Sequence, residues 1–173
     1  VEDKHWWFVG RRAILESFLG RIAADLRKTK DELRILDVGC GTGANLEMLK
    51  QFGEAEGVDV SDDALEFCRK KGLKVHKGLA EELPFADETF DLVTALDVVE
   101  HLDDDIAGLK EMRRVLKKDG KTLIFVPAFM WLWGVQDDIS NHRIRYKRKE
   151  IVERLEKAGF TIERATYANI TVF

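Results

Sequence analysis

The sequence is poor in cysteine, has no long apolar run and carries no excess of basic charge. Its two cysteines, Cys40 and Cys68, are too few for a disulfide framework or a four-cysteine zinc site. It shows no signal peptide and no integral membrane segment, so we expect a cytoplasmic protein. The net charge of −4 argues against nucleic acid as a partner, because nonspecific binding requires a basic surface.

The length and the absence of internal repeats indicate one domain. A chain of 173 residues can bury a sizeable core. Residues 1–173 are therefore predicted to form one domain, whose oligomeric state the sequence leaves open. Two segments stand out within it: an aromatic and helical N-terminal segment, residues 1–30, and a long aromatic connection, residues 128–146. Connections of that length in compact domains are usually functional or disordered, and the large apolar residues argue against disorder.

The chain is organised around a glycine-rich turn that follows a short apolar stretch. The stretch from Leu33 ends near an acid, Asp37, and the turn contains Gly39, Gly41 and Gly43. Glycine allows positive φ angles and a close approach of the backbone to a ligand. Apolar residues at helical spacing follow, and the start of a helix offers free N–H groups. This strand, turn and helix predict a nucleotide-cofactor site.

The residues leave more than one cofactor open. Gly39, Gly41 and Ala44 fit the dinucleotide fingerprint, with Asp59 about 20 residues further on, so an NAD-binding oxidoreductase is one alternative. Asp37 would repel a pyrophosphate, whereas it would attract a ligand with an ammonium and a sulfonium group, such as S-adenosylmethionine. A cofactor-binding domain without methyltransferase activity is a further alternative, because fold does not dictate function.

Four stretches in order resemble the motifs of class I S-adenosylmethionine-dependent methyltransferases. The opening Trp6-Trp7-Phe8 run with Arg11 and Arg12 is similar to the start of a bacterial group of small-molecule and lipid methyltransferases. The resemblance implies methyl transfer, with S-adenosylhomocysteine as product. The four stretches are Leu36-Asp37-Val38-Gly39-Cys40-Gly41-Thr42-Gly43, Gly57-Val58-Asp59-Val60-Ser61, Glu82-Leu83-Pro84-Phe85 with Phe90-Asp91-Leu92-Val93, and Val115-Leu116-Lys117-Lys118-Asp119-Gly120.

The resemblance also implies roles for individual residues. We expect Asp59 to bind both ribose hydroxyls and Glu81 to accept from the adenine amino group, with Ala80 nearby. Arg11 or Arg12 is expected to reach the methionine carboxylate. The predicted cofactor-binding set is Arg11, Asp37, Gly39, Cys40, Gly41, Thr42, Gly43, Asn45, Asp59, Val60, Ala80, Glu81 and Leu96.

The alternation of strands and helices predicts an α/β, Rossmann-like, doubly wound and mostly parallel sheet with helices on both faces. The family order would be 3-2-1-4-5, with a sixth strand beyond the fifth. The tail after Tyr167 barely has room for the family's last antiparallel strand, which leaves open whether the natural protein extends beyond Phe173. Strands are expected over residues 33–38, 54–60, 73–78, 91–96, 121–127 and 160–167, and helices over 13–26, 44–49, 62–71, 103–116 and 147–158.

Titratable residues follow the fourth predicted strand, and ligands of such sheets bind at the carboxyl ends of strands. Asp97 and His101 are therefore the predicted catalytic residues, with His101 as the base for a hydroxyl acceptor. The acceptor is expected to be a small or lipid-linked molecule, under a lid formed by residues 1–30 and 128–146. The predicted acceptor contacts are Trp131, His142, Arg143 and Tyr146.

A divalent metal is the alternative to a side-chain base. Asp97-x-x-Glu100-His101 resembles the Glu-x-x-Glu-His run that is associated with a metal in the ubiquinone-pathway O-methyltransferases. Two carboxylates with one imidazole would suit magnesium or manganese better than zinc. The first carboxylate here is the shorter aspartate, however. We therefore predict no metal ligands from the sequence.

Overall fold

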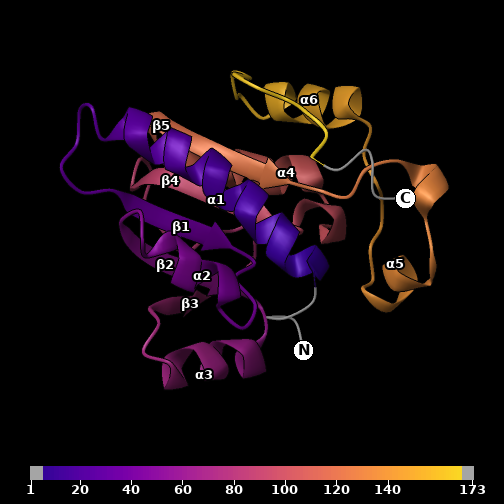
Figure 1. The fold of residues 1–173 in the computed structure, drawn as a ribbon, viewed down its shortest axis with the longest axis horizontal. Coiled ribbons are helices and arrows are strands. Elements are labelled where there is room, and N and C mark those ends of the chain that lie inside the picture. The colour runs from indigo at the N-terminus through magenta and orange to yellow at the C-terminus, as the bar shows by residue number, and fades with distance from the viewer. Residues whose placement is uncertain (1–5, 169–173) are drawn as a thin grey trace.

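The sheet of this protein has five parallel strands in the order β3-β2-β1-β4-β5 (Figure 1). The structure, a computed structural model, describes residues 6–168, with the side chains of residues 10–168. The order and the α/β class confirm the prediction. The elements are α1 Trp6–Leu26, β1 Arg34–Val38, α2 Ala44–Leu49, β2 Glu54–Asp59, α3 Asp62–Lys70, β3 Val75–Lys77, β4 Phe90–Leu96, η2 Val99–His101, α4 Asp105–Val115, β5 Leu116–Phe125, η3 Met130–Leu132, α5 Val135–Ile139 and α6 Arg148–Lys157.

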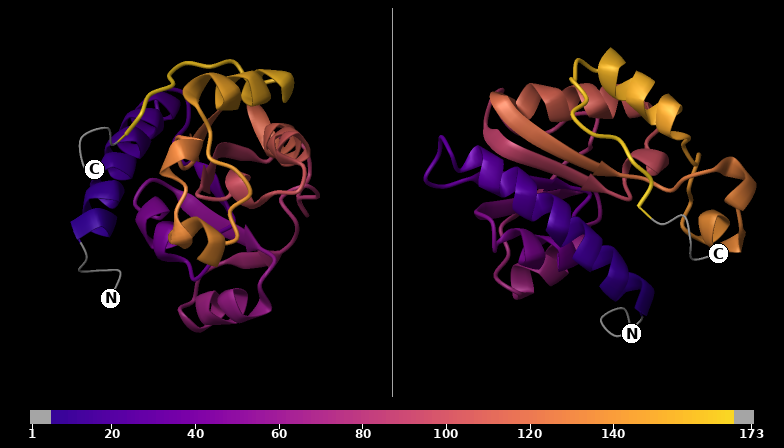
Figure 2. Two further views of the ribbon diagram at one scale, coloured as in Figure 1. Left: turned by 90° about the vertical axis from the view of Figure 1, so that its right-hand side faces the viewer. Right: turned by 45° about the horizontal axis from the view of Figure 1, so that its top comes forward.

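Helices cover both faces of the sheet (Figure 2). Successive side chains of a strand point to opposite faces, so β1 divides its apolar residues between two cores. Ile35 packs in one core with α1, α2 and α3, whereas Leu36 and Val38 pack in the other with α4 and α6. All seven residues of β4 are buried, as a central parallel strand requires. None of the helices in the described chain is long and apolar enough to cross a bilayer.

The carboxyl ends of the strands meet at one edge of the sheet, and three segments gather there. The N-terminal part of α1, the glycine turn after β1, and residues 128–146 with η3 and α5 all lie at this edge (Figure 1). The parallel register aligns Asp37 of β1 with Thr94 of β4 and with Gly57 of β2. Residues far apart in sequence therefore meet around the end of β1.

The predicted sixth strand is wrong. Residues 160–167 form no strand, and β5 is an edge of the sheet in the part of the chain that the structure describes. The segment is held by its side chains instead: Phe160 packs in the core of α4 and α6, Glu163 pairs with Lys121, and Tyr167 stacks on Phe129. A strand contributes alternate residues to one core, whereas Thr161, Glu163 and Arg164 are exposed.

Several boundaries also differ from the prediction. α1 begins at Trp6 instead of residue 13, β5 begins at Leu116 with an irregular register against β4, and residues 128–146 contain two short helices. The expected role of the Trp6 and Trp7 side chains in a lid, and the tail from residue 169, lie outside the described residues.

Candidate functional site

The glycine turn is fastened to the end of β2 by backbone and side-chain hydrogen bonds. Gly39, Gly41 and Gly43 have φ angles of 67°, 51° and 84°, which favour glycine. The Gly39 N–H donates to the carbonyl of Val58 at 2.8 Å. The Gly41 N–H donates to Oδ2 of Asp59, also at 2.8 Å. The turn and the acid of β2 therefore form one rigid unit.

Asp59 lies where the predicted ribose-binding acid should lie, at the carboxyl end of β2. Its other oxygen, Oδ1, accepts from the Ser61 N–H at 2.9 Å, and the residue is half-buried. A carboxylate offers about four lone-pair sites, so these two bonds leave Asp59 able to accept further hydrogen bonds from a ligand. Val60 beside it is exposed, whereas Cys40 points into the core under Gly57, so only its backbone faces the turn.

Asp37 is a buried carboxylate that is only half satisfied. The Thr94 hydroxyl donates to its Oδ1 at 2.7 Å, and its Oδ2 has no hydrogen-bond partner among residues 6–168. Burial raises the pKa of Asp37 to about 7, against the opposing effects of the Thr94 hydrogen bond and the Arg11 charge. A buried oxygen without a partner carries a desolvation cost, which a bound cation would relieve.

Arg11 links the first helix to the end of β4. Its guanidinium forms an ion pair with Asp97 and lies 5.2 Å from the centre of the Phe125 ring. Its Nε is buried and, within the described chain, has no partner. Asp97 has a φ angle of 60°, uncommon for a residue other than glycine, and such strain is frequent at functional sites.

Arg11 and Asp37 together offer a donor and an acceptor that have no partner in the part of the chain that the structure describes. The two groups are near enough for the positive charge of Arg11 to lower the pKa of Asp37. A free amino acid carries an ammonium and a carboxylate, which would pair with Asp37 and Arg11 respectively. The two side chains come from α1 and β1, and their meeting is a product of the tertiary fold.

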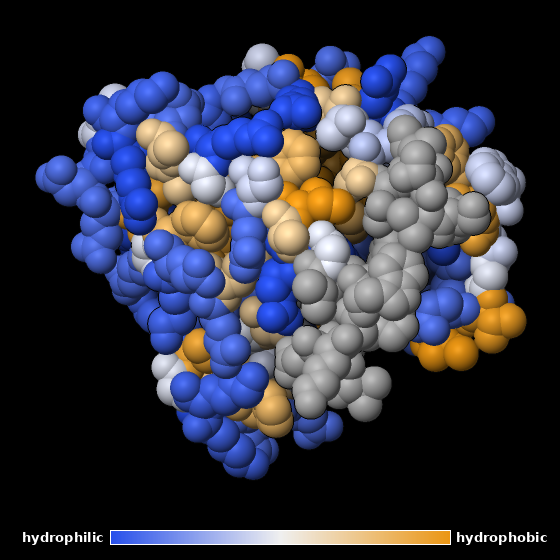
Figure 3. Space-filling view, in the orientation of Figure 1, coloured by the Kyte–Doolittle hydropathy of each residue, from blue (hydrophilic) through white to orange (hydrophobic). Residues whose placement is uncertain are grey.

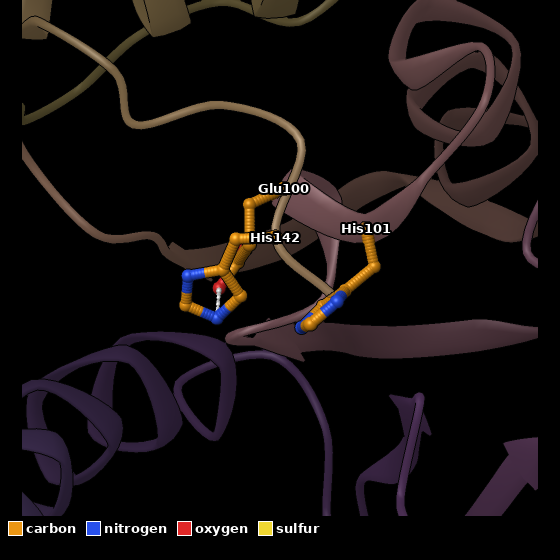
Figure 4. A group of neighbouring side chains, drawn as sticks. All are labelled: Glu100, His101 and His142. Atoms are coloured by element: carbon orange, nitrogen blue, oxygen red, sulfur yellow. Dashed lines mark ion pairs between the residues drawn. The ribbon is translucent and has the colours of Figure 1, made fainter. Parts of the chain in front are cut away.

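A second cluster of titratable side chains includes residues that follow Asp97 after the end of β4. Glu100 and His101 belong to η2, and His142 follows α5 (Figure 4). Glu100 is fully buried, and neither of its carboxylate oxygens has a hydrogen-bond partner in the described chain. Burial, aided by the charge of Asp97, raises the pKa of Glu100 to about 8. His142 Nε2 lies 4.0 Å from Glu100 Oε1.

Asp137 holds His142 in place, a role that the sequence analysis missed. Its Oδ1 accepts from Nδ1 of His142 at 2.8 Å, and both its oxygens accept from Arg145, at 2.7 and 2.9 Å. Arg145 keeps the pKa of Asp137 well below its usual range. A signal existed in the sequence: an acid and two basic residues within an aromatic loop need partners once the loop is packed.

The structure corrects the expectation for Tyr146. This side chain is buried in the core, and its hydroxyl donates to Asp105 at 2.9 Å, so it does not face an acceptor. Arg143 pairs with Asp103 at 2.5 Å and is half exposed, and Trp131 is 75% exposed. Ala80 and Leu96 are buried, and the remaining predicted cofactor contacts, Thr42, Asn45 and Glu81, are half-buried or exposed.

The fold and the family motifs agree with known methyltransferases. A family model described as "Methyltransferase domain" matches residues 36–124. The structure of YcgJ from Bacillus subtilis has a TM-score of 0.63, with 26% identity, over 81% of this chain and 66% of that chain. A phosphoethanolamine N-methyltransferase from Haemonchus contortus, in complex with S-adenosyl-L-methionine, has a TM-score of 0.66 and 25% identity, over 83% of this chain and 36% of that one.

The chain belongs to the methyltransferase-domain family, and its domain is a class I S-adenosylmethionine-dependent methyltransferase domain. Among curated relatives, the rice 2-methyl-6-phytyl-1,4-hydroquinone methyltransferase 2 is 33% identical over 92% of this chain and 46% of its own length. The chain spans about half the length of the curated methyltransferases that it matches. The family therefore favours S-adenosylmethionine over NAD.

Proposed function

We propose that this protein transfers a methyl group from S-adenosylmethionine to a hydroxyl of a lipid-linked acceptor. The observation that carries the cofactor assignment is a pair of buried atoms, Arg11 Nε and Asp37 Oδ2, which belong to groups of opposite charge and have no partner among the described residues. These suit the carboxylate and ammonium of the methionine end. Methyl transfer from a sulfonium needs chiefly alignment, so such fixed contacts contribute directly to the rate.

In our proposal, the other cofactor contacts lie along the edge where the carboxyl ends of the strands meet. The half-buried Asp59 binds the ribose hydroxyls, and the backbone of residues 39–43 borders the methionine part. Ala80 and Glu81 lie against the adenine. Asp59 already holds the turn through the Gly41 N–H, so one carboxylate would organise both the backbone and the ribose.

Two features support a lipid-linked acceptor. Trp131, Val135 and Ile139 are 75%, 75% and 69% exposed, and apolar side chains lie at the surface over α5 (Figure 3). A cluster of exposed apolar residues is typical of a surface that meets apolar ligands or membranes. The rice relative also has a phytyl-bearing hydroquinone in its name. We infer that residues 128–146 bind the apolar tail of the acceptor, beside the carboxyl ends of the strands.

We propose that His101 meets the acceptor hydroxyl and that His142 and Arg143 border the acceptor. We assign Asp97 a positioning role instead of direct contact with the acceptor, because its carboxylate is paired with Arg11. The same ion pair joins residues 1–30 to the end of β4, which supports a lid over the cofactor. Limited proteolysis with and without S-adenosylhomocysteine tests the lid: we expect protection of residues 6–12 and 129–146, and cleavage unchanged by the ligand would contradict it.

Calorimetric titration with S-adenosylhomocysteine and NADH tests the cofactor assignment. We expect binding of S-adenosylhomocysteine only, and binding of NADH alone would refute the proposal. The acceptor is tested by incubating the protein with tritiated-methyl S-adenosylmethionine and a total lipid extract. We expect label in the organic phase, whereas label only in water-soluble products would exclude a lipid-linked acceptor.

A further inference from the structure

Glu100, His101 and His142 form a cluster of potential metal ligands at the end of β4. One ligand atom from each residue lies within 4.8 Å of the others. The two imidazole rings approach edge to face, with centroids 4.8 Å apart, and Glu100 lies beside His142 (Figure 4). Two ligands come from η2 and the third from the segment after α5, so only the folded chain brings them together.

The second observation is that Glu100 is buried without a hydrogen-bond partner among the described residues. Its side chain is fully buried, and among residues 6–168 nothing forms a hydrogen bond with either oxygen. Buried carboxylates are normally paired or bound to a metal, because their desolvation is costly. Nε2 of His142 lies 4.0 Å from Oε1 of Glu100, which is beyond hydrogen-bond distance. The carboxylate thus points into the cluster with both oxygens available.

Both histidines are oriented as metal ligands usually are. Nδ1 of His142 lies 2.8 Å from Oδ1 of Asp137, and Nδ1 of His101 lies 3.4 Å from the carbonyl oxygen of Asn141. Each Nδ1 is placed to donate a proton to its acceptor, and in that tautomer Nε2 keeps its lone pair. A carboxylate or carbonyl behind the imidazole is the usual outer partner of a metal-bound histidine, and it fixes both tautomer and ring orientation.

We propose that Glu100, His101 and His142 bind one divalent transition-metal ion of the zinc class. Two imidazoles and one carboxylate suit zinc, cobalt or ferrous iron better than magnesium. Ligands at about 2.0–2.2 Å from a tetrahedral ion are roughly 3.4 Å apart. The ligand atoms, now up to 4.8 Å apart, would approach one another by up to about 1.4 Å. Among the described residues, no hydrogen bond to Glu100 would have to be broken. This set differs from the sequence run, because Asp97 is paired with Arg11 and His142 takes its place.

The chemical role of this site rests on the proposed function. With three protein ligands, a bound metal would keep a position open for the acceptor oxygen and would lower the pKa of its hydroxyl. The hydroxyl proton would leave to solvent. The methyl carbon would then form a bond to the acceptor oxygen as its bond to the sulfonium sulfur breaks, and S-adenosylhomocysteine would depart as a neutral thioether. His101 would then meet the acceptor hydroxyl through the metal, which would supply the activation otherwise expected of a side-chain base.

Calorimetry with zinc and cobalt chlorides, on protein first dialysed against a chelator, tests the site. We expect one ion per chain and a visible absorption band of low-symmetry cobalt. His142→Ala and Glu100→Gln should each weaken binding by more than the roughly 10–100-fold that loss of an outer partner costs. The matched control is His76→Ala, because His76 is bound to Glu56 at 2.7 Å and lies on β3.

Titration with S-adenosylhomocysteine in the same samples separates the possible failures. Variants that bind it as the wild type does are folded, and their loss of metal supports the site. A wild type that binds S-adenosylhomocysteine but no zinc or cobalt overturns this inference alone. Metal binding that survives both His142→Ala and Glu100→Gln also overturns it, because the ion is then held elsewhere. Absence of S-adenosylhomocysteine binding in the wild type refutes the proposed function.

Discussion

Replacing Asp37 by asparagine should stabilise the protein and weaken cofactor binding. The carboxylate is buried, and one of its oxygens has no partner among the described residues, so its ionisation opposes folding. Asparagine has the same shape and can still accept from the Thr94 hydroxyl. It carries no charge for the ammonium of the cofactor, and its amide N–H₂ would point where the ammonium should bind.

The magnitude follows from the pKa of Asp37. Its ordinary value is 3.8, and in the folded protein it is raised to about 7. Between these values the folded chain keeps a proton that the unfolded chain has lost, so the free energy of unfolding falls as pH rises. The slope is about 1.4 kcal/mol per pH unit, which gives up to about 4 kcal/mol above pH 7. Asp37→Asn removes this contribution.

The difference in unfolding free energy between the variant and the wild type isolates Asp37 from all other titrating groups. Urea denaturation from pH 4 to 8.5 should show this difference growing in favour of the variant up to about pH 7 and then staying constant. S-adenosylhomocysteine should bind the wild type more tightly as pH rises through 7, and the variant at least ~10-fold more weakly at pH 8. Parallel stability profiles, or undiminished affinity, would refute this account of Asp37.

Three further substitutions test other parts of the site and fold. Asp59→Ala should weaken S-adenosylhomocysteine binding by about 10–150-fold, from the loss of charge-assisted hydrogen bonds, and unchanged affinity by calorimetry would contradict its ribose role. Gly39→Ala should cost about 1–3 kcal/mol in thermal unfolding, because φ is positive and a Cβ would lie 2.4 Å from a Val98 methyl. Gly10→Ala is its control and should be neutral or stabilising, because Gly10 lies inside α1 and no atom of the described residues lies within 4 Å of the added Cβ. Tyr146→Phe should lower stability by about 1 kcal/mol and leave S-adenosylhomocysteine affinity intact, whereas a loss of affinity would restore this residue to the ligand site.

Much of the fold and of the cofactor side was predictable, because the relevant signals are local. An apolar run, an acid and a glycine turn define β1 and its loop within a dozen residues, and Asp59 follows at the end of the next apolar run. The strand order then follows from the parallel crossovers of this family. The sixth strand was predicted wrongly because residues 160–167 hold apolar side chains that anchor a loop instead of pairing with β5.

Only the tertiary structure decided what the polar residues do with one another. By its position in the chain, Asp97 could have been a metal ligand or a catalytic base, but α1 brings Arg11 against it. Tyr146 and His142 are four residues apart in one loop, yet one is in the core and the other in the polar cluster. The state of a buried carboxylate depends on which groups, distant in sequence, approach within a few ångströms. Local spacing along the chain carries no record of those approaches.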